Sequence, residues 1–118
     1  MKAEIFEFTR SEKTPAIIEK RITEFLKKVS LKKVIQFEHG SSGKLYYSLF
    51  YNESSEGDCG IKVLRAIGTK AISKAVNDNI KALDLMDVTQ SGQISTNGVI
   101  TTLFYKTKKT KKEDELVN

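Results

Sequence analysis

The sequence is short of the residues on which disulfides and membrane spans depend. It contains one cysteine, Cys59, so no internal disulfide can form and a reducing cytosol is the expected compartment. No run of 18 apolar residues is present, which predicts that no segment spans a membrane. Glu4, Glu7 and Arg10 interrupt the apolar residues near the N-terminus, so the pattern of a signal peptide is absent. We therefore expect a cytoplasmic protein without a membrane partner.

Residue patterns that support catalysis or bind metal ions are also scarce. The sole histidine, His39, has no neighbouring cluster of cysteine, aspartate or histidine, so we expect an exposed turn residue rather than a general base or a metal ligand. Cys59 follows an aspartate, whereas a reactive thiol needs nearby positive charge. Residues 40–44, Gly-Ser-Ser-Gly-Lys, lack the spacing of a phosphate-binding loop, and no helix follows them. The sequence therefore predicts no catalytic residue, no metal site and no cofactor.

Charge gives a weaker indication. The formal net charge of +5 suggests an acidic partner. The segment from Lys106 onward carries five lysines and three acidic residues, which leaves a net charge of +3 on the rest of the chain. That balance is ordinary for a solvated surface, so composition alone is weak support for nucleic-acid binding.

The chain contains an internal repeat. A shift of 54 residues places Leu-Phe-Tyr at 49–51 on Leu-Phe-Tyr at 103–105 without a gap. Further identities at this shift include Ile18/Ile72, Lys20/Lys74, Lys27/Lys81, Val34/Val88, Gln36/Gln90 and Ser41/Ser95. Residues 3–6 align with 61–64 at a shift of 58, so the first copy has four extra residues before its helix. Because the match also preserves the apolar pattern, the sequence predicts a tandem duplication.

Each copy has the pattern strand, helix, strand, strand. This predicts an α+β fold, a duplicated β-α-β-β unit with an antiparallel-rich sheet and two helices packed on one face. Thr14 and Pro15 signal the start of the first helix, and its apolar stripe runs to Val29. Thr69 is the expected cap of the second helix, and Asn97-Gly98 predicts a tight hairpin turn.

Four segments follow from this reading. The first unit is expected at 1–52 and the second at 61–106. Residues 53–60 form a polar linker that joins the copies flexibly, and the charged tail at 107–118 is expected to be disordered.

The strand at 45–51 carries large apolar or aromatic groups on both faces. One face has Leu45, Tyr47, Leu49 and Tyr51, and the other has Tyr46, Ser48 and Phe50. A strand with water on one side alternates more cleanly, so we expect a helix to cover one face and a partner subunit the other. The candidate subunit contacts are Tyr47, Tyr51 and Tyr105.

Basic residues cluster around the first helix and the segment after it. The candidates are Lys20, Arg21, Lys27, Lys28, Lys32 and Lys33. With Tyr46, Tyr47 and Tyr51 they could form a groove that follows a phosphate backbone while the rings stack on bases. The alternative is a solvated helix face beside core aromatics, which is the more common origin of such a pattern.

Four segments of the first half carry a further pattern: Lys-Ala-Glu-Ile-Phe at 2–6, Ile-Thr-Glu-Phe-Leu at 22–26, Val-Ile-Gln at 34–36 and Leu-Phe-Tyr at 49–51. In these segments residues 1–52 and, more loosely, 61–106 resemble a family of very small sporulation proteins. The resemblance implies a cytosolic protein of a spore-forming bacterium or its phage, built from one β-α-β-β unit and without established catalytic residues. This chain departs from the family pattern because it contains two units.

The expected function is therefore non-catalytic binding of a protein or small ligand by an oligomer that self-associates. Two alternatives remain: a nucleic-acid-binding accessory protein that uses the basic helix surface, and a phage-encoded sponge for a nucleotide signal. The loops at 39–43 and 91–98 and the linker at 52–60 differ most between the copies, so they are the expected site region.

Overall fold

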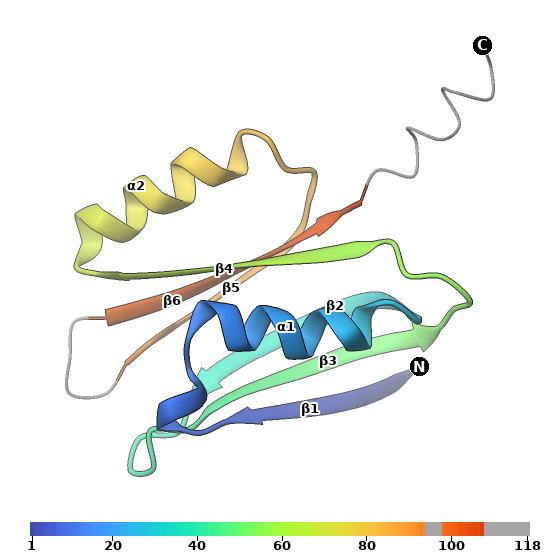
Figure 1. Cartoon of the computed structure of the whole chain (residues 1–118), viewed down its shortest axis with the longest axis horizontal. Helices are drawn as coiled ribbons and strands as arrows, with labels where there is room; N and C mark the ends of the chain where they lie inside the picture. The colour runs from blue at the N-terminus through green and yellow to red at the C-terminus, as the bar shows by residue number, and fades with distance from the viewer. Residues whose placement is uncertain (94–97, 108–118) are drawn as a thin grey trace.

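The computed structural model describes residues 1–93 and 98–107. Its elements, in order, are β1 (Lys2–Phe8), a short 3-10 helix (Arg10–Glu12), α1 (Pro15–Leu26), β2 (Val29–Glu38), β3 (Leu45–Glu53), β4 (Cys59–Ile67), α2 (Thr69–Ile80), β5 (Leu85–Gly92) and β6 (Gly98–Lys106) (Figure 1). The order strand, helix, strand, strand occurs twice, as predicted. The predicted turn at Asn97 and the tail from residue 108 lie outside the described residues. Neither helix is long and apolar enough to cross a bilayer.

The strands form two three-stranded sheets. Sheet A has the order β1-β3-β2 and sheet B the order β4-β6-β5, and the central strand of each is antiparallel to both neighbours. The pairing register matches between the sheets at the 54-residue offset, because Val34 pairs with Leu49 and Val88 with Leu103. Each sheet also has an irregularity at the matching point of its third strand, between 31 and 33 in β2 and between 85 and 87 in β5.

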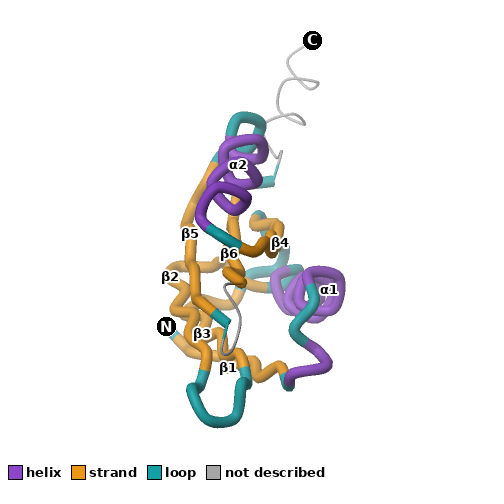
Figure 2. Tube along the Cα trace, turned by 90° about the vertical axis from the view of Figure 1, so that its left-hand side faces the viewer, coloured by secondary structure: helices purple, strands orange, loops and turns teal. Residues whose placement is uncertain are grey.

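The predicted α+β class, with antiparallel strands and two helices, is confirmed. The strands form two separate sheets rather than one sheet. The core lies between sheet A, α1 and one face of sheet B, and it includes Ile22 of α1, Leu49 of β3 and Phe104 of β6. Leu103 and Ile72 are buried on the opposite face of sheet B, where α2 packs. Figure 2 shows sheet B between the first unit and α2.

The start of α1 follows the sequence signal. Thr14 is the N-cap, its hydroxyl accepts a hydrogen bond from the amide of Ile17 at 3.4 Å, and Pro15 occupies the first helical position. The helix ends at Leu26, earlier than its apolar stripe suggests. Val29 instead begins β2 and is buried there. An apolar residue just after a helix can continue the helical spacing while belonging to a strand, so periodicity alone could not place this boundary.

The linker and the second helix also differ from the predictions. The linker is held against the end of α1, since the amide of Gly57 donates to the carbonyl of Lys27 at 2.7 Å and that of Ser54 to Lys28 at 3.1 Å. The linker is therefore docked on the two residues that follow α1 rather than being a flexible connection. Thr69 is the first residue of α2, and Gly68, with φ at 92°, takes the N-cap position. That left-handed conformation favours glycine.

Candidate interaction surfaces

Neither α1 nor α2 covers one face of sheet A. We call it the outer face; the pairing register places on it Ala3, Ile5, Glu7, Lys33, Ile35, Phe37, Tyr46, Ser48 and Phe50. Ile5, Ile35 and Phe37 are 64%, 43% and 47% exposed. The Phe37 ring stacks on that of Tyr46 with centroids 5.1 Å apart. Isolated apolar residues on a surface are ordinary, but a contiguous apolar patch marks a surface that binds a partner.

The matching face of sheet B is closed. Phe104 and Thr102 occupy the positions on β6 that Phe50 and Ser48 occupy on β3. Both β6 side chains are fully buried. The first unit covers them, and the hydroxyl of Tyr47 lies 2.7 Å from that of Thr102. The two units therefore differ in how they use equivalent faces: one is buried inside the chain and the other is exposed.

Side chains rather than a backbone ladder join the units where β2 lies beside β5. Buried Gln36 donates from Nε2 to the hydroxyl of Ser91 at 2.8 Å and to the carbonyl of Ile100 at 3.0 Å. Its Oε1 accepts from the hydroxyls of Thr89 and Thr102 at 2.7 and 2.9 Å. A buried amide with both donors and its acceptor engaged fixes the alignment of the elements that it links.

Two carboxylates complete this joint. Asp87 on β5 accepts a hydrogen bond from the amide of Val34 at 3.2 Å. Glu19 on α1 accepts one from the amide of Val63 at 2.7 Å. Both amides belong to edge strands, β2 and β4, whose outward backbone groups have no strand partner. Hydrogen bonds to ionised groups are stronger than neutral ones, so these contacts hold sheet B against the first unit.

α2 covers sheet B incompletely. Ile72 is the single buried residue of the helix, and Val88 on β5 is 45% exposed. Two adjoining hollows of about 450 and 220 Å³ lie beside α2, and both are lined by Ile72, Ser73 and Gln90. We call them together the α2 groove; its other lining residues are Thr69, Val76, Asn77, Ser91, Gly92 and Val99. The groove opens between the helix and the β5 side of the sheet.

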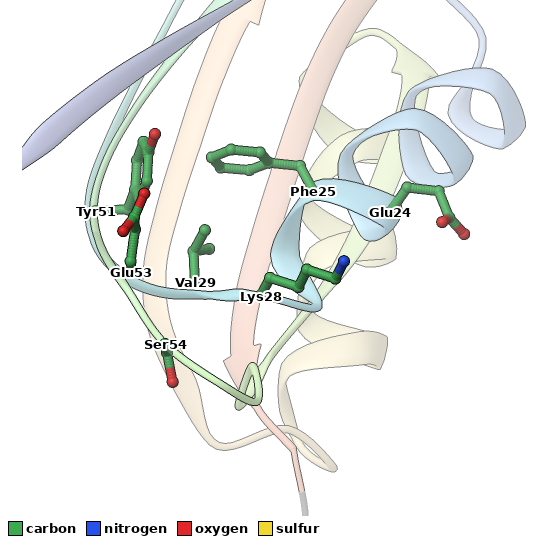
Figure 3. Close-up of a pocket in the computed structure, with 7 residues that line it drawn as sticks. All are labelled: Glu24, Phe25, Lys28, Val29, Tyr51, Glu53 and Ser54. Carbon is green, nitrogen blue, oxygen red and sulfur yellow. The ribbon is translucent and has the colours of Figure 1, made fainter.

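A third hollow, of about 480 Å³, lies at the end of α1. It is lined by Glu24, Phe25, Lys28, Val29, Tyr51, Glu53 and Ser54 (Figure 3). The Phe25 ring extends toward Tyr51, with centroids 4.9 Å apart and the rings nearly perpendicular. The floor of this hollow is therefore aromatic, and it includes Ser54 of the linker that the sequence predicted as part of a site.

The rim of this third hollow carries charge of both signs. Glu24 pairs with Lys27 at 2.9 Å and Glu53 with Lys2 at 2.8 Å. These hydrogen-bonded lysines lower the pKa of both carboxyl groups, which are therefore ionised at neutral pH. Each carboxylate at the rim is thus balanced by a lysine, and Lys28 also lines the hollow.

The six basic residues predicted to contact nucleic acid are divided among α1, the two residues after it and β2. Lys20 and Arg21 lie in α1, Lys27 and Lys28 directly after it, and Lys32 and Lys33 in β2. The Arg21 guanidinium lies 4.3 Å from the centroid of the Phe8 ring and donates to the carbonyl of Glu7. Lys27 is paired with Glu24, whereas Lys33 belongs to the outer face. The structure thus separates these cations and engages two of them within the chain.

The three tyrosines predicted as subunit contacts lie away from the outer face. Tyr47 is fully buried, and burial raises the pKa of its phenol, so its ring is closed to a second subunit. Tyr51 is half-buried beside Phe25. Tyr105 is half-buried over Gly60, where an added Cβ would lie 2.5 Å from the ring. The face of β3 that carries Tyr47 and Tyr51 is the one that α1 and sheet B cover.

The two side chains weighed as catalytic candidates lie in different surroundings, His39 on the surface and Cys59 in the core. His39 is exposed in the β2–β3 hairpin, as predicted, and its Nδ1 lies 3.0 Å from the hydroxyl of Ser42. Cys59 is buried, and this burial together with Asp58 raises the pKa of the thiol to about 12. Across residues 1–93 and 98–107, no three His, Cys, Asp or Glu side chains are grouped to hold a metal ion.

No protein-family model, no curated protein and no solved structure matches the chain.

The sequence reasoning missed the exposed apolar residues of β1 and β2. Ile35 and Phe37 alternate with Val34 and Gln36, so the apolar groups of β2 also lie on both faces of the strand. Residues 33–38 therefore carried the same signal of a second apolar face as residues 45–51. The apolar residues on that face of β2, Ile35 and Phe37, are the ones that the structure leaves exposed.

Proposed function

We propose that this protein is a non-catalytic interaction protein that binds further copies of itself through the outer face of sheet A. One observation carries the proposal. The face of sheet B that matches the outer face is buried by the first unit, with Phe104 fully covered, whereas the outer face stays open. The fold already contains one surface that receives such a face, so a second copy of the chain is the occupant that the structure favours.

The chemistry of the outer face supports this. Ile5, Ile35 and Phe37 expose apolar surface, and removing such surface from water contributes roughly 25 cal/mol per Å². The outer face also borders β1, which is an edge strand of sheet A. Edge strands present backbone groups that a neighbouring chain can pair with. Apolar area next to a free edge is typical of a surface that another protein covers.

The non-catalytic part of the proposal is supported by the state of the best nucleophile. The raised pKa of Cys59 keeps its thiol protonated at neutral pH, and the thiolate is the reactive form. The cytoplasmic location expected from the single cysteine stays a prediction.

Light scattering on the full chain tests the proposal. We expect the mean mass to rise above 13.3 kDa with concentration in the micromolar range. Ile35→Lys places a charge in the outer face and should return the mass to that of one chain. Ile17→Lys is the matched control, because Ile17 is 37% exposed but lies on α1. A wild-type mass of 13.3 kDa at every concentration would contradict the proposal.

The alternatives inferred from the sequence receive less support. The candidate cations are spread over α1, the two residues after it and β2, and two of them, Arg21 and Lys27, make contacts within the chain. A gel shift at increasing salt tests nucleic-acid binding. A complex that weakens steeply with salt and is lost when Lys27, Lys28, Lys32 and Lys33 are replaced by Glu would favour that alternative.

A further inference from the structure

The geometry points to a head-to-tail contact, in which the outer face of one chain enters the α2 groove of the next. This contact repeats between chains the joint that holds the two units of one chain together. The inference rests on the proposed self-association and specifies its second surface. That second surface differs from the first, so the contact is not a symmetric face-to-face dimer.

The joint within the chain supplies the template. Figure 2 shows β5 beside β2 and β4 beside α1, so that sheet B closes the opening between α1 and β2 of the first unit. Gln36 donates a hydrogen bond to the carbonyl of Ile100, Glu19 accepts one from the amide of Val63, and these two bonds hold sheet B there. The side chains that enter the opening, such as Ile100 and Phe104, belong to the face of sheet B that lies opposite α2.

The second unit has a corresponding opening, and within residues 1–93 and 98–107 the groove found there is lined by residues of that unit alone. The opening of the first unit lies between α1 and β2, and that of the second between α2 and β5, where the α2 groove is found. Gln36 on β2 and Gln90 on β5 occupy equivalent positions. Gln36 pairs with Tyr47 and Gln90 pairs with Thr101, and the two pairs are related by the 54-residue shift. Gln36 is buried by sheet B, whereas Gln90 is exposed and lines the groove.

Several contacts of the template have counterparts between chains. Within the chain, Gln36 accepts a hydrogen bond from the hydroxyl of Thr102. The outer-face residue that matches Thr102 is Ser48, so Ser48 of one chain offers a hydroxyl to Gln90 of the next. Val63 and Ile5 pair with these two hydroxyl residues, so their amides point to the free edges of β4 and β1. Ser73 lines the groove at the position that Glu19 occupies in α1, so it is the counterpart of Glu19 for the amide of Ile5 in the next chain.

One counterpart is absent, which makes the contact between chains weaker than the joint within a chain. Asp87 accepts the amide of Val34, but the residue at the matching place on the outer face is Lys33, which has no acceptor. Ser73 also offers a neutral oxygen where Glu19 offers a charged one. A reversible association is therefore expected, and because the two surfaces differ it adds chains in one direction and forms a ring only if the rotation closes.

Mixing two blocked variants tests this arrangement. Ile35→Lys closes the outer face, and Ser73→Arg places a long cation in the α2 groove. Analytical ultracentrifugation should show each variant alone as a single chain, and the mixture as a dimer, because each variant retains the surface that the other has lost. A Ser73→Arg protein that associates as the wild type does, while Ile35→Lys does not, would overturn the head-to-tail contact and leave the proposed self-association standing. A wild-type protein that never associates would overturn both.

A second variant gives a result that misfolding cannot imitate. Ser73→Glu restores the carboxylate that Glu19 provides within the chain, and a hydrogen bond to a charged group should lower the dissociation constant about tenfold. Ala71→Glu is the control, because it adds the same charge to α2 at an exposed position outside the groove lining. Equal strengthening by both variants, or none by Ser73→Glu, would contradict the contact.

Discussion

Two phenylalanines 54 residues apart show how one residue type takes different roles in the two units. Phe104 is fully buried between sheet B and the first unit, whereas Phe50 is half-buried on the outer face. Truncation of a buried phenylalanine leaves a cavity, so Phe104→Ala should lower the free energy of unfolding by about 3–5 kcal/mol. Phe50→Ala should cost clearly less in dilute protein. Urea unfolding at low concentration measures both, and equal losses would contradict the assigned faces.

The thiol of Cys59 provides a test of burial by reactivity. Its pKa is raised from 9.0 to about 12, so native protein at pH 8 should react with a thiol-specific disulfide reagent only slowly, and denatured protein at once. The raised pKa also makes the free energy of unfolding depend on pH, because the thiol ionises at a lower pH in the unfolded chain than in the folded one. The contribution of the protonated thiol to that free energy is complete below pH 9 and declines as the pH rises toward 12. Fast labelling of native protein would contradict the buried placement.

At the scale of elements, the capping residues predicted where α1 starts better than the apolar spacing predicted where it ends. The threonine and proline at 14 and 15 define the first turn of α1, and the structure confirms that cap. The end of α1 could not be predicted, because Val29 satisfies the helical spacing and the strand equally well. The linker was predicted as flexible from its polar composition. Its ordered state depends on backbone hydrogen bonds to residues 27 and 28, which composition does not encode.

Gly57 tests whether the linker is docked. A Cβ at this position would lie 1.8 Å from the carbonyl oxygen of Leu26. That oxygen belongs to the backbone, so it cannot move aside as the end of a flexible side chain could. Gly57→Ala therefore requires the linker to move and should destabilise the protein by more than about 1 kcal/mol. Gly40→Ala is the control, since nothing lies within 4 Å of its added Cβ. Thermal unfolding compares the two, and equal midpoints would indicate that the linker is not held against α1.

At the scale of the whole molecule, the sequence predicted the unit but not how the units meet. The pairings of β2 with β3 and of β5 with β6 follow from short connections, whereas the order that places β1 beside β3 and β4 beside β6 was not predicted. The joint depends on Gln36, whose partners lie 53 to 66 residues away, and on an edge of β2 that is closed by Asp87 rather than by a strand. The sequence also predicted two apolar faces on β3, and it assigned the partner to the tyrosine side. Residues 45, 47, 49 and 51 form an unbroken apolar series, whereas Ser48 interrupts the other face, so the unbroken face is the one that the core takes.

The exposed isoleucines allow the central claim to be measured within the wild-type protein. Ile5 and Ile35 lie on the outer face, whereas Ile17 and Ile67 are exposed elsewhere, on α1 and at the end of β4. Selective labelling of isoleucine methyl groups and dilution across the micromolar range follow all four by nuclear magnetic resonance. We expect the signals of Ile5 and Ile35 to shift or broaden as concentration rises, and those of Ile17 and Ile67 to stay constant. Constant signals from Ile5 and Ile35 at every concentration would contradict self-association through the outer face.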